Sequence, residues 1–577
     1  MDSVVKEVAV ASPGGFELES EGVGALPIVE HFFSRIGLAE TLGSYLPNDD
    51  GRLRLDPAVV IAVVVANIVV SHRPLYSLAE WVRTYDPGLF GLESSQAAAL
   101  NDDRVGRMLD RLFDADRASL VTETVLKVIE EFEIELDELH NDSTTVTVTG
   151  TYDHADGYTR GGKPTPALRQ GHNKDFRPDL KQLLYILTIS ADGAVPIAYR
   201  TADGNTPDDR THIPTFDELV RLVGTPSFLY VADSKLCSSD AMRHIDANGG
   251  RFVTVVPHGR KEDTFFKDWV QTHVPAWKEA DRRPGARLGD PDRVWRTFEA
   301  PVPSTDGYRV IWIHSSGKAA RDAASRIARI ETGLGAIEAL QARLSSPKSR
   351  IRTRVAADEA AAFCLAEAGA TRFVSVTVTE QVEVTYHQEK RGRPGTSTRY
   401  RKSEKLQFSV TAAVRSDNVA YDAMTDGMFP LITNDRQMTP AEVLAAYRYQ
   451  PNLERRNHML KGPQQVAPVY LEHAHRIEAL MLCHFLAMVT EALIEREIRT
   501  AMKEEGLAGI PLYPELRNCP SPSAPRILEI FAGVQRHHLV SDGELIQVFE
   551  PQLEPLQLKV LELLHVPAAA YESRDAS

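Results

Sequence analysis

Residues 228–233 have the sequence FLYVAD, five apolar residues followed by an aspartate. A continuous apolar run of this length is typical of a strand that is buried on both faces of a sheet. Helical patterns lie on either side of it, at residues 213–223 and 239–248, and another apolar strand pattern follows at residues 252–256. This alternation predicts an α/β domain. Asp233 would then stand at the carboxyl end of a buried strand, where ligands of open α/β sheets bind.

Three strand patterns precede this alternation. Residues 145–148 (TVTV) alternate as a half-buried strand does, and residues 183–189 (LLYILTI) and 195–199 (VPIAY) are separated by a turn at Asp192-Gly193. Three strands followed by helix, strand, helix and strand is the order of a ribonuclease-H-like domain, although other α/β folds give similar orders. We therefore expect an α/β fold with a ribonuclease-H-like catalytic core.

With 577 residues, the chain is too long for one compact domain. After the α/β pattern, we expect a long helix at residues 319–344 and a hairpin with arms at residues 373–384 and 406–414. The predicted domains are a helical N-terminal domain with possible DNA binding at 1–135, the catalytic core at 136–257 and 426–505, a mixed α+β insertion domain at 258–425, and a helical C-terminal region at 506–577.

The net charge of −15 does not exclude a nucleic-acid partner, because the acidic residues gather at the two ends. Residues 1–50 carry a net charge of −7 and residues 541–577 a net charge of −5. Residues 390–405, in contrast, hold seven Lys/Arg and a single acid, and residues 160–181 hold six Lys/Arg. Such clusters suit phosphate contacts. For one cluster alone, a solubilising loop is the favoured interpretation.

Two aspartates border the predicted strands. Asp142 stands at the beginning of the first strand, and Asp233 directly follows the buried one. Each has a structural alternative, since Asp142 suits a turn and Asp233 suits a helix N-cap.

A third acid, Glu454, lies near the start of a short helix. Residues 439–442 (TPAE) form a capping box for the preceding helix. Pro451 should end that helix, and Asn452 is a suitable N-cap for the next one, which places Glu454 in its first turn. Lys461, about two turns further on, should project from the same face.

Three carboxylates suit Mg²⁺ or Mn²⁺, because these ions prefer oxygen ligands. If Asp142, Asp233 and Glu454 converge, they could hold two ions about 4 Å apart, which would stabilise both the attacking and the leaving oxygen of a phosphoryl displacement. The sequence alone does not show that residues so far apart converge.

Residues 447–461 closely resemble the Y-x2-R-x3-E-x6-K signature of DDE transposases from bacterial insertion sequences, with Tyr447, Gln450, Glu454 and Lys461 at the signature positions. Residues 140–145 (HNDSTT) and 231–236 (VADSKL) resemble the two aspartate motifs of that family. Further segments that resemble its members are GHNKDFRPDLKQ (171–182), DGNTPD (203–208) and RIEALMLCHFLAMVTEALIEREIR (476–499). The subgroup indicated has a large insertion before the glutamate.

The resemblance implies that Asp142, Asp233 and Glu454 are catalytic and hold the metal ions. It also implies that Tyr447, Lys461 and the residue at the arginine position contact DNA phosphates. That residue is Gln450 here, which can donate a hydrogen bond but brings no charge. The implied partner is double-stranded DNA, both the terminal inverted repeats of an element and the target, bound by a homodimer.

Arg391 and Arg393 lie in the sequence RGRP, which resembles the core of an AT-hook, a motif whose arginines enter the narrow minor groove of A·T-rich DNA. A basic hairpin tip without sequence preference fits the same residues.

The sequence therefore predicts a transposase that cleaves the ends of its element and transfers the strands to target DNA. A ribonuclease-H-like nuclease without strand transfer and a catalytically silent, transposase-derived DNA-binding protein are the alternatives. Four cysteines without paired spacing, and residues 1–15 without the layout of a signal peptide, predict a cytoplasmic protein.

Overall fold

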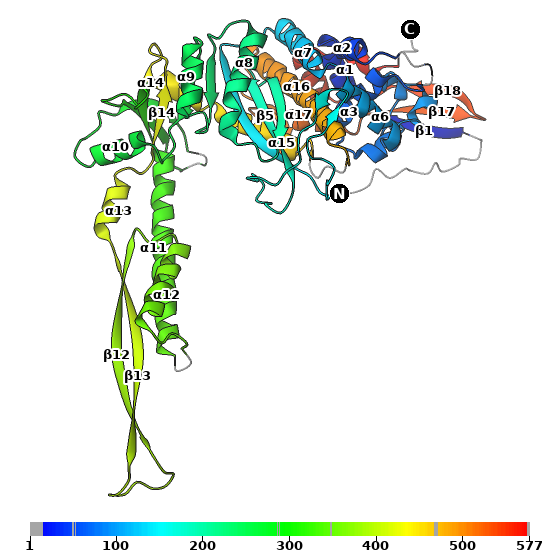
Figure 1. Cartoon of the computed structure of the whole chain (residues 1–577). Helices are drawn as coiled ribbons and strands as arrows, with labels where there is room; N and C mark the ends of the chain where they lie inside the picture. The colour runs from blue at the N-terminus through cyan, green and yellow to red at the C-terminus, as the bar shows by residue number, and fades with distance from the viewer. Residues whose placement is uncertain are drawn as a thin grey trace. The chain divides into compact units, whose positions relative to one another are not determined.

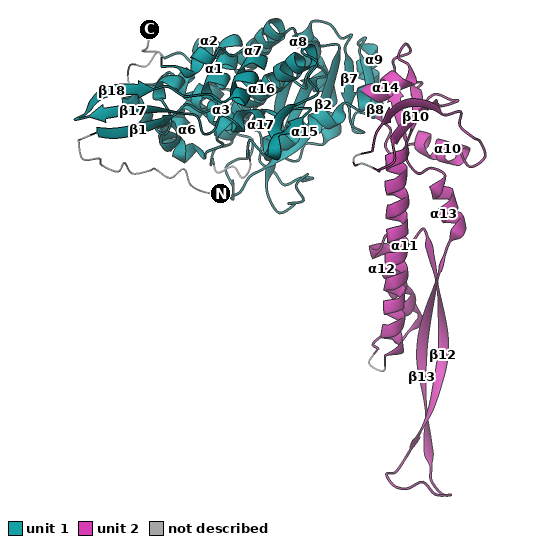
Figure 2. Cartoon of the chain, turned by 180° about the vertical axis from the view of Figure 1, so that it is seen from behind, with its two compact units in different colours: residues 1–254, 446–577 teal, residues 255–445 magenta. Residues whose placement is uncertain are grey.

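The computed structural model describes residues 16–48, 51, 53–285, 287, 289–346, 349–466 and 471–573. The first fifteen residues, on which the signal-peptide argument rests, lie outside this part. The chain forms two compact units, which Figures 1 and 2 show. Unit 1 comprises residues 1–254 and 446–577, and unit 2 comprises residues 255–445.

The centre of unit 1 is a mixed sheet with the strand order β6-β5-β2-β7-β8. Strand β5 runs antiparallel to both β2 and β6, whereas β7 runs parallel to β2 and to β8. Helix α9 (Ser239–Ala247) makes the crossover between the parallel strands β7 and β8. The strands are β2 (Glu138–Thr147), β5 (Gln182–Ser190), β6 (Pro196–Asp203), β7 (Leu229–Ala232) and β8 (Arg251–Val255).

Helices cover both faces of this sheet. On one face, Phe216 of α8 (His212–Val223) packs against Tyr230 of β7, with ring centroids 6.1 Å apart. On the other face, His140 of β2 contacts Tyr449, which immediately precedes α15 (Gln450–Lys461), with ring centroids 4.9 Å apart. Burial on both faces explains why β7 is apolar throughout and why β5, although it begins with Gln182 and ends with Ser190, is mostly apolar.

The N-terminal part of unit 1 is helical, and it packs around the long helix α16 (Ala474–Glu504). By length and composition α16 could cross a membrane, but 94% of its most apolar stretch is buried inside the protein, as expected for a core helix. Asp56 caps α3 by accepting a hydrogen bond from Ala58 N at 2.8 Å. The helices are α1 (Leu26–Arg35), α2 (Leu38–Tyr45), α3 (Pro57–Val70), α4 (Leu78–Val82), α5 (Ser94–Ala97), α6 (Asp102–Asp114) and α7 (Arg117–Phe132).

The C-terminal region is not purely helical, and this corrects the expectation from sequence. Strand β17 lies between β1 (Phe16–Gly22) and β18, so the two ends of the described chain share one antiparallel sheet. Arg536 of β17 is 3% exposed and pairs with Glu21, Asp86 and Glu550. The C-terminal elements are β15 (Ile510–Tyr513), β16 (Arg517–Cys519), α17 (Ala524–Glu529), β17 (Gln535–Ser541), β18 (Glu544–Phe549) and α18 (Pro555–Leu563).

Unit 2 contains an antiparallel sheet with the order β14-β11-β10-β9. Phe266 of α10 stacks on Trp312 of β11, with ring centroids 3.6 Å apart, and forms with Val270 and Val310 a small core. The elements are α10 (Lys261–Trp269), β9 (Lys278–Arg283), β10 (Arg293–Glu299), β11 (Arg309–Ser315) and β14 (Met428–Thr433).

A long arm completes unit 2. Helix α11 (Ser316–Ser345) and helix α12 (Arg354–Glu367) pack against a two-stranded ribbon of β12 (Val374–Gln388) and β13 (Tyr400–Val414), which pairs over fifteen residues. Figures 1 and 2 both show the ribbon extending beyond the two helices. The expected hairpin is thus present, with longer arms than the sequence indicated. Helix α13 (Ser416–Ala423) follows the ribbon.

Replacing Phe266 by alanine should destabilise unit 2 by about 3–5 kcal/mol, because a fully buried aromatic side chain that stacks on Trp312 is lost. The neighbouring Phe265 is 45% exposed and serves as the matched control. Urea unfolding followed by tryptophan fluorescence measures both variants. Equal losses for Phe265→Ala and Phe266→Ala would contradict this description of the core.

Candidate active site

The sheet register places Asp142 and Asp233 side by side. In the parallel pair β2–β7, Asn141 lies opposite Ala232, so the next residue on each strand is an aspartate. Neighbouring strands lie about 5 Å apart, and residues at the same step point to the same face. Asp142 is in the middle of β2 and not at the beginning of a strand, because residues 138–141 already pair with β7. Asp233 follows the end of β7, as the sequence predicts.

The Asp142 carboxylate is partly buried and has two polar neighbours. Asn457 of α15 donates a hydrogen bond from Nδ2 to Oδ2 at 3.0 Å, and Lys174 Nζ lies 3.7 Å from Oδ1. Burial raises the pKa of Asp142, the charge of Asp233 raises it further and Lys174 opposes both, which leaves it at about 6. Burial is the main cause, because taking a carboxylate out of water disfavours its charged form.

Glu454 lies on the helix that covers this face of the sheet. Helix α15 begins at Gln450, two residues before the predicted N-cap Asn452, and Pro451 occupies its first turn, where proline is tolerated. Glu454 is exposed, and Asn457 lies one turn further along the same face. The contact between Asn457 and Asp142 therefore brings the Glu454 helix to the first aspartate.

Tyr447 lies within the electrostatic influence of two of the acids, Asp233 and Glu454. Its side chain is half-buried, and its pKa is raised to about 12 by burial and by the charges of Asp233 and Glu454. The phenol consequently keeps its proton at neutral pH and is a hydrogen-bond donor.

A buried ion pair anchors α15. Arg456 is 1% exposed; its Nη1 lies 3.0 Å from Glu495 Oε2 on α16, and its Nε donates to the carbonyl of Ala194 at 2.9 Å. A second bond runs from Nη2 to Gly193 O at 3.2 Å. These contacts hold α15 against α16 and against the turn between β5 and β6. They thereby fix the rotation of α15 about its axis and the direction of the face that carries Glu454.

Gln450 has a structural position. It is 7% exposed, its Oε1 lies 2.9 Å from His140 Nδ1, and its Nε2 donates to the Asn141 carbonyl at 3.2 Å. Both ends of its amide are thus used to hold α15 against β2. This arrangement differs from the DNA contact expected at this position, because the amide is not accessible.

Lys461 and the segment 171–182 meet at the edge of the site. Lys461 Nζ lies 2.6 Å from Asp175 Oδ1. The preceding residue, Lys174, bonds to the Ser143 carbonyl at 2.5 Å and lies 3.4 Å from Asp208. Both lysines are therefore held by protein acceptors, and Lys461 would have to leave Asp175 to bind a phosphate.

Two buried polar atoms near the carboxylates, Asn457 Oδ1 and His212 Nε2, have no hydrogen-bond partner within the part of the chain that the structure describes. Burial lowers the pKa of His212 to about 4, although Asp233 and Asp208 oppose this, so the ring is neutral. Sequence reasoning missed Asn457, Lys174, Asp208 and His212. The signal for Asn457 was its helical spacing from Glu454, whereas Lys174 and Asp208 lie in two segments already noted, 171–182 and 203–208.

Among the described residues, no group of three or more His, Cys, Asp or Glu side chains is arranged to hold a metal ion. Asp142 and Asp233 share one face at adjacent register positions, whereas Glu454 is exposed. Two carboxylates suffice for Mg²⁺, which keeps several waters. Arg391 and Arg393 belong to unit 2 and are exposed at the turn between β12 and β13.

Comparisons with known proteins add little to this geometry. A family model described as a domain of unknown function (DUF4277) matches residues 18–126. No curated protein matches the chain. A cryo-EM structure of the piggyBac transposase synaptic complex with hairpin DNA is 8% identical, with a TM-score of 0.36, and the match covers 88% of this chain and 79% of that one. A likeness at this level carries no argument about fold or function.

Replacing Arg456 by methionine should cost about 3 kcal/mol, because Glu495 loses a buried partner. Arg455→Met is the matched control, since Arg455 is the exposed neighbour on the same helix. Chemical unfolding measures the difference between the two variants. Equal stability of both would show that the ion pair does not anchor α15.

Replacing Asp142 by asparagine should stabilise the metal-free protein above pH 6. The folded-state pKa of about 6 exceeds the ordinary value of 3.8, so wild type loses stability as pH rises between these values. The variant avoids this loss, and its advantage should grow from pH 4 to pH 6 and reach on the order of 2–3 kcal/mol. Unfolding in EDTA across this range measures it.

The control is Asp179→Asn, because Arg177 lowers the pKa of that exposed carboxylate and no gain is expected. An advantage of Asp142→Asn that does not change between pH 4 and pH 7 would refute the assignment.

Proposed function

We propose that the chain is a transposase, a metal-dependent enzyme that cleaves DNA strands and joins them to a target. The observation that carries the proposal is the adjacent register of Asp142 and Asp233, with the Glu454 helix held beside Asp142 through Asn457. These are the three acids that the resemblance to DDE transposases of bacterial insertion sequences implies.

The strand order of unit 1 supports a ribonuclease-H-like core. Three antiparallel strands (β2, β5, β6) are followed by two strands parallel to the first, and β2 is central. In such a core the first strand and the end of the fourth strand carry the two aspartates, which agrees with β2 and β7 here. Unit 2 would be the insertion that separates the second aspartate from the glutamate.

Asp142 and Asp233 fit a divalent cation because their carboxylates occupy neighbouring register positions on one face of the sheet, and Mg²⁺ prefers carboxylate oxygens. The two unpartnered polar atoms nearby, Asn457 Oδ1 and His212 Nε2, also leave hydrogen-bonding capacity for water or ligand. Mg²⁺ or Mn²⁺, bound as two ions with Glu454, would activate the nucleophile and stabilise the leaving oxygen.

The chain's own residues orient the reaction. Asn457 holds one oxygen of Asp142, and the backbone N–H of Lys235 donates to Asp233 Oδ1 at 2.9 Å. Tyr447, protonated at neutral pH, can donate to a phosphate oxygen between Asp233 and Glu454. Lys461 can neutralise a DNA phosphate once its ion pair with Asp175 has broken. In the first step water would attack the phosphorus, and the 3′-oxygen of the element end would leave. In the second step that 3′-hydroxyl would attack a phosphorus of the target, and the target's 3′-oxygen would leave. Joining the two ends of one element implies a dimer on DNA.

A second candidate is a silent, transposase-derived DNA-binding protein. It is favoured by the exposed position of Glu454 and by Lys174, whose ammonium group already lies near Asp142. A nuclease without strand transfer would share the proposed site and differ only in the joining step.

Mg²⁺-dependent nicking and joining of DNA that carries the flanking ends of the gene tests the proposal. Asp142→Asn, Asp233→Asn and Glu454→Gln should each lower activity by at least about 1,000-fold, because each removes a carboxylate that holds the reacting centre. Glu472→Gln, which changes an exposed acid elsewhere in unit 1, is the control. DNA binding without cleavage in wild type would favour the silent relative, and cleavage without joining would favour the nuclease.

A further inference from the structure

The outer half of the β12–β13 ribbon has an apolar face that nothing in the described chain covers. Side chains directly opposite each other in an antiparallel pair point to the same face. One face therefore carries the pair Val382 and Leu406, then Val384, Tyr386 and Tyr400, which lie opposite Glu404, Lys402 and Gln388. The other face of this half is polar throughout.

The same face is covered in the inner half of the ribbon. There Val374, Val378, Phe408 and Val410 are at most 5% exposed and pack against α11 and α12. Beyond these helices the apolar stripe continues, but its side chains are 41–65% exposed, and Tyr386 is the most exposed of them. An amphipathic ribbon that protrudes in this way is typical of a binding surface.

Cations gather at the tip of the ribbon and on its polar face. Residues 390–405 contain seven Lys/Arg, and among the described residues only Lys402 has an ion-pair partner, Glu404. The six others, which form no ion pair with any described residue, are Lys390, Arg391, Arg393, Arg399, Arg401 and Lys405. Six free cations in a protein of net charge −15 point to a polyanion as the partner.

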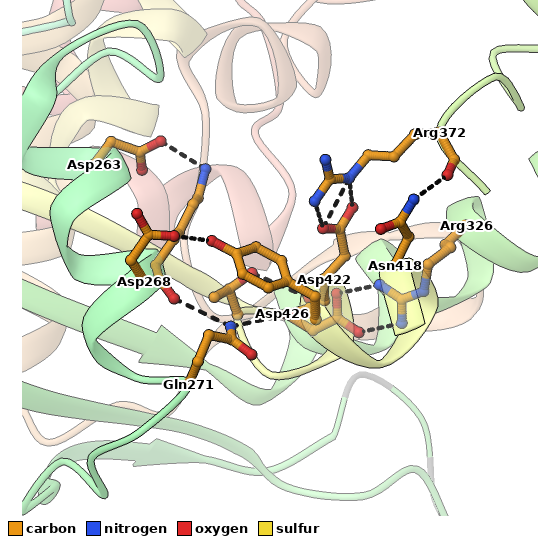
Figure 3. A network of polar contacts seen from close by, with 11 residues as sticks. Asp263, Asp268, Gln271, Arg326, Arg372, Asn418, Asp422 and Asp426 are labelled. Carbon is orange, nitrogen blue, oxygen red and sulfur yellow. Dashed lines mark hydrogen bonds and ion pairs between the residues drawn. The ribbon is translucent and has the colours of Figure 1, made fainter. Parts of the chain in front are cut away.

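The base of the arm is fixed, so the ribbon can present these groups in a defined orientation. Figure 3 shows the contacts that hold α13 at this base. Arg372 binds Asp422 at 2.7 Å, Arg326 binds Asp426 at 2.6 Å, and Tyr421 donates to Asp268 of α10. Sites on rigid elements hold their geometry better than sites on loops.

We propose that the outer half of this ribbon lies in the minor groove of double-stranded DNA, with Val382, Val384, Tyr386, Tyr400 and Leu406 against the sugars and base edges and the tip cations on the phosphates. β-Ribbons are narrow enough for DNA grooves, and apolar side chains that enter the minor groove widen it and bend the duplex. This surface belongs to unit 2, whereas the carboxylates belong to unit 1. It shares with the proposed function only the partner, DNA.

A second copy of the chain fits the surface less well. A two-fold contact uses the same patch on both copies. Pairing two outer halves would bring two clusters of six unpaired cations to one interface, and like charges oppose such a contact.

The test uses the full-length chain and short duplexes with an A·T-rich or a G·C-rich centre. The double variant Tyr386→Thr/Leu406→Thr removes apolar surface. It introduces threonine at both positions, because strands favour this β-branched residue. Thr385→Ala, on the polar face of the same strand, is the control. Arg391→Gln/Arg393→Gln removes two of the cations. Fluorescence anisotropy over a range of salt concentrations gives the Kd, and energy transfer between the duplex ends reports bending.

The apolar-face variant should weaken binding at least roughly tenfold and reduce bending, with an unchanged salt dependence. The arginine variant should lower the slope of log Kd against log salt by about 2, or about 1 per residue. Unchanged affinity and bending in the apolar-face variant would overturn the inference. The inference would also be overturned if wild type sedimented as a dimer and the apolar-face variant as a monomer, with DNA binding intact. That result would assign the face to a second copy of the chain.

The two proposals fail separately. If the ribbon variants weaken DNA binding while wild type does not cleave, the ribbon inference holds and the transposase proposal fails. If wild type cleaves and joins DNA while the ribbon variants bind like wild type, the ribbon inference alone fails. Circular dichroism confirms that each variant folds.

Discussion

The geometry of the candidate site depends on the buried ion pair between Arg456 and Glu495. Removing these charges from water is costly, and the pair is stable only because Arg456 also bonds two backbone carbonyls and Glu495 accepts from Ala524 N and pairs with Arg499. Because such contacts need defined geometry, they fix how α15 lies on the sheet. Glu454 and Asn457 take their positions from that helix.

The buried charge of Asp142 is less well compensated by its neighbours than the charges of the Arg456–Glu495 ion pair. Asp142 is removed from water beside Asp233, and Lys174 offsets only part of the cost of this burial, so the pKa of Asp142 stays near 6. A protein that kept this arrangement for stability alone would gain by losing one of the acids. Functional sites commonly retain unfavourable electrostatics of this kind, because ligand or metal binding relieves them.

Much of the local structure was predictable. The apolar run of β7, the crossover helix α9, the helix α11 and the hairpin were all evident, because burial on both faces, amphipathic spacing and turn residues leave clear patterns. The C-terminal strands were missed, since β17 is stabilised by β1 more than 500 residues away and not by a local signal. The contact of Asn457 with Asp142 was missed, and the bond between Gln450 and His140 was not foreseen. In both cases the partner is distant in sequence.

The sequence by itself determined the strands and helices around the candidate site and the hairpin of the arm, and which residue types stand at the ends of the buried strands, since these follow from local periodicity and charge. Only the tertiary structure decided that Asp142 and Asp233 occupy neighbouring register positions, and that the amide of Gln450 is buried while the outer ribbon is not. The physical reason is that pairing and burial depend on which distant surfaces meet, and no short segment carries that information.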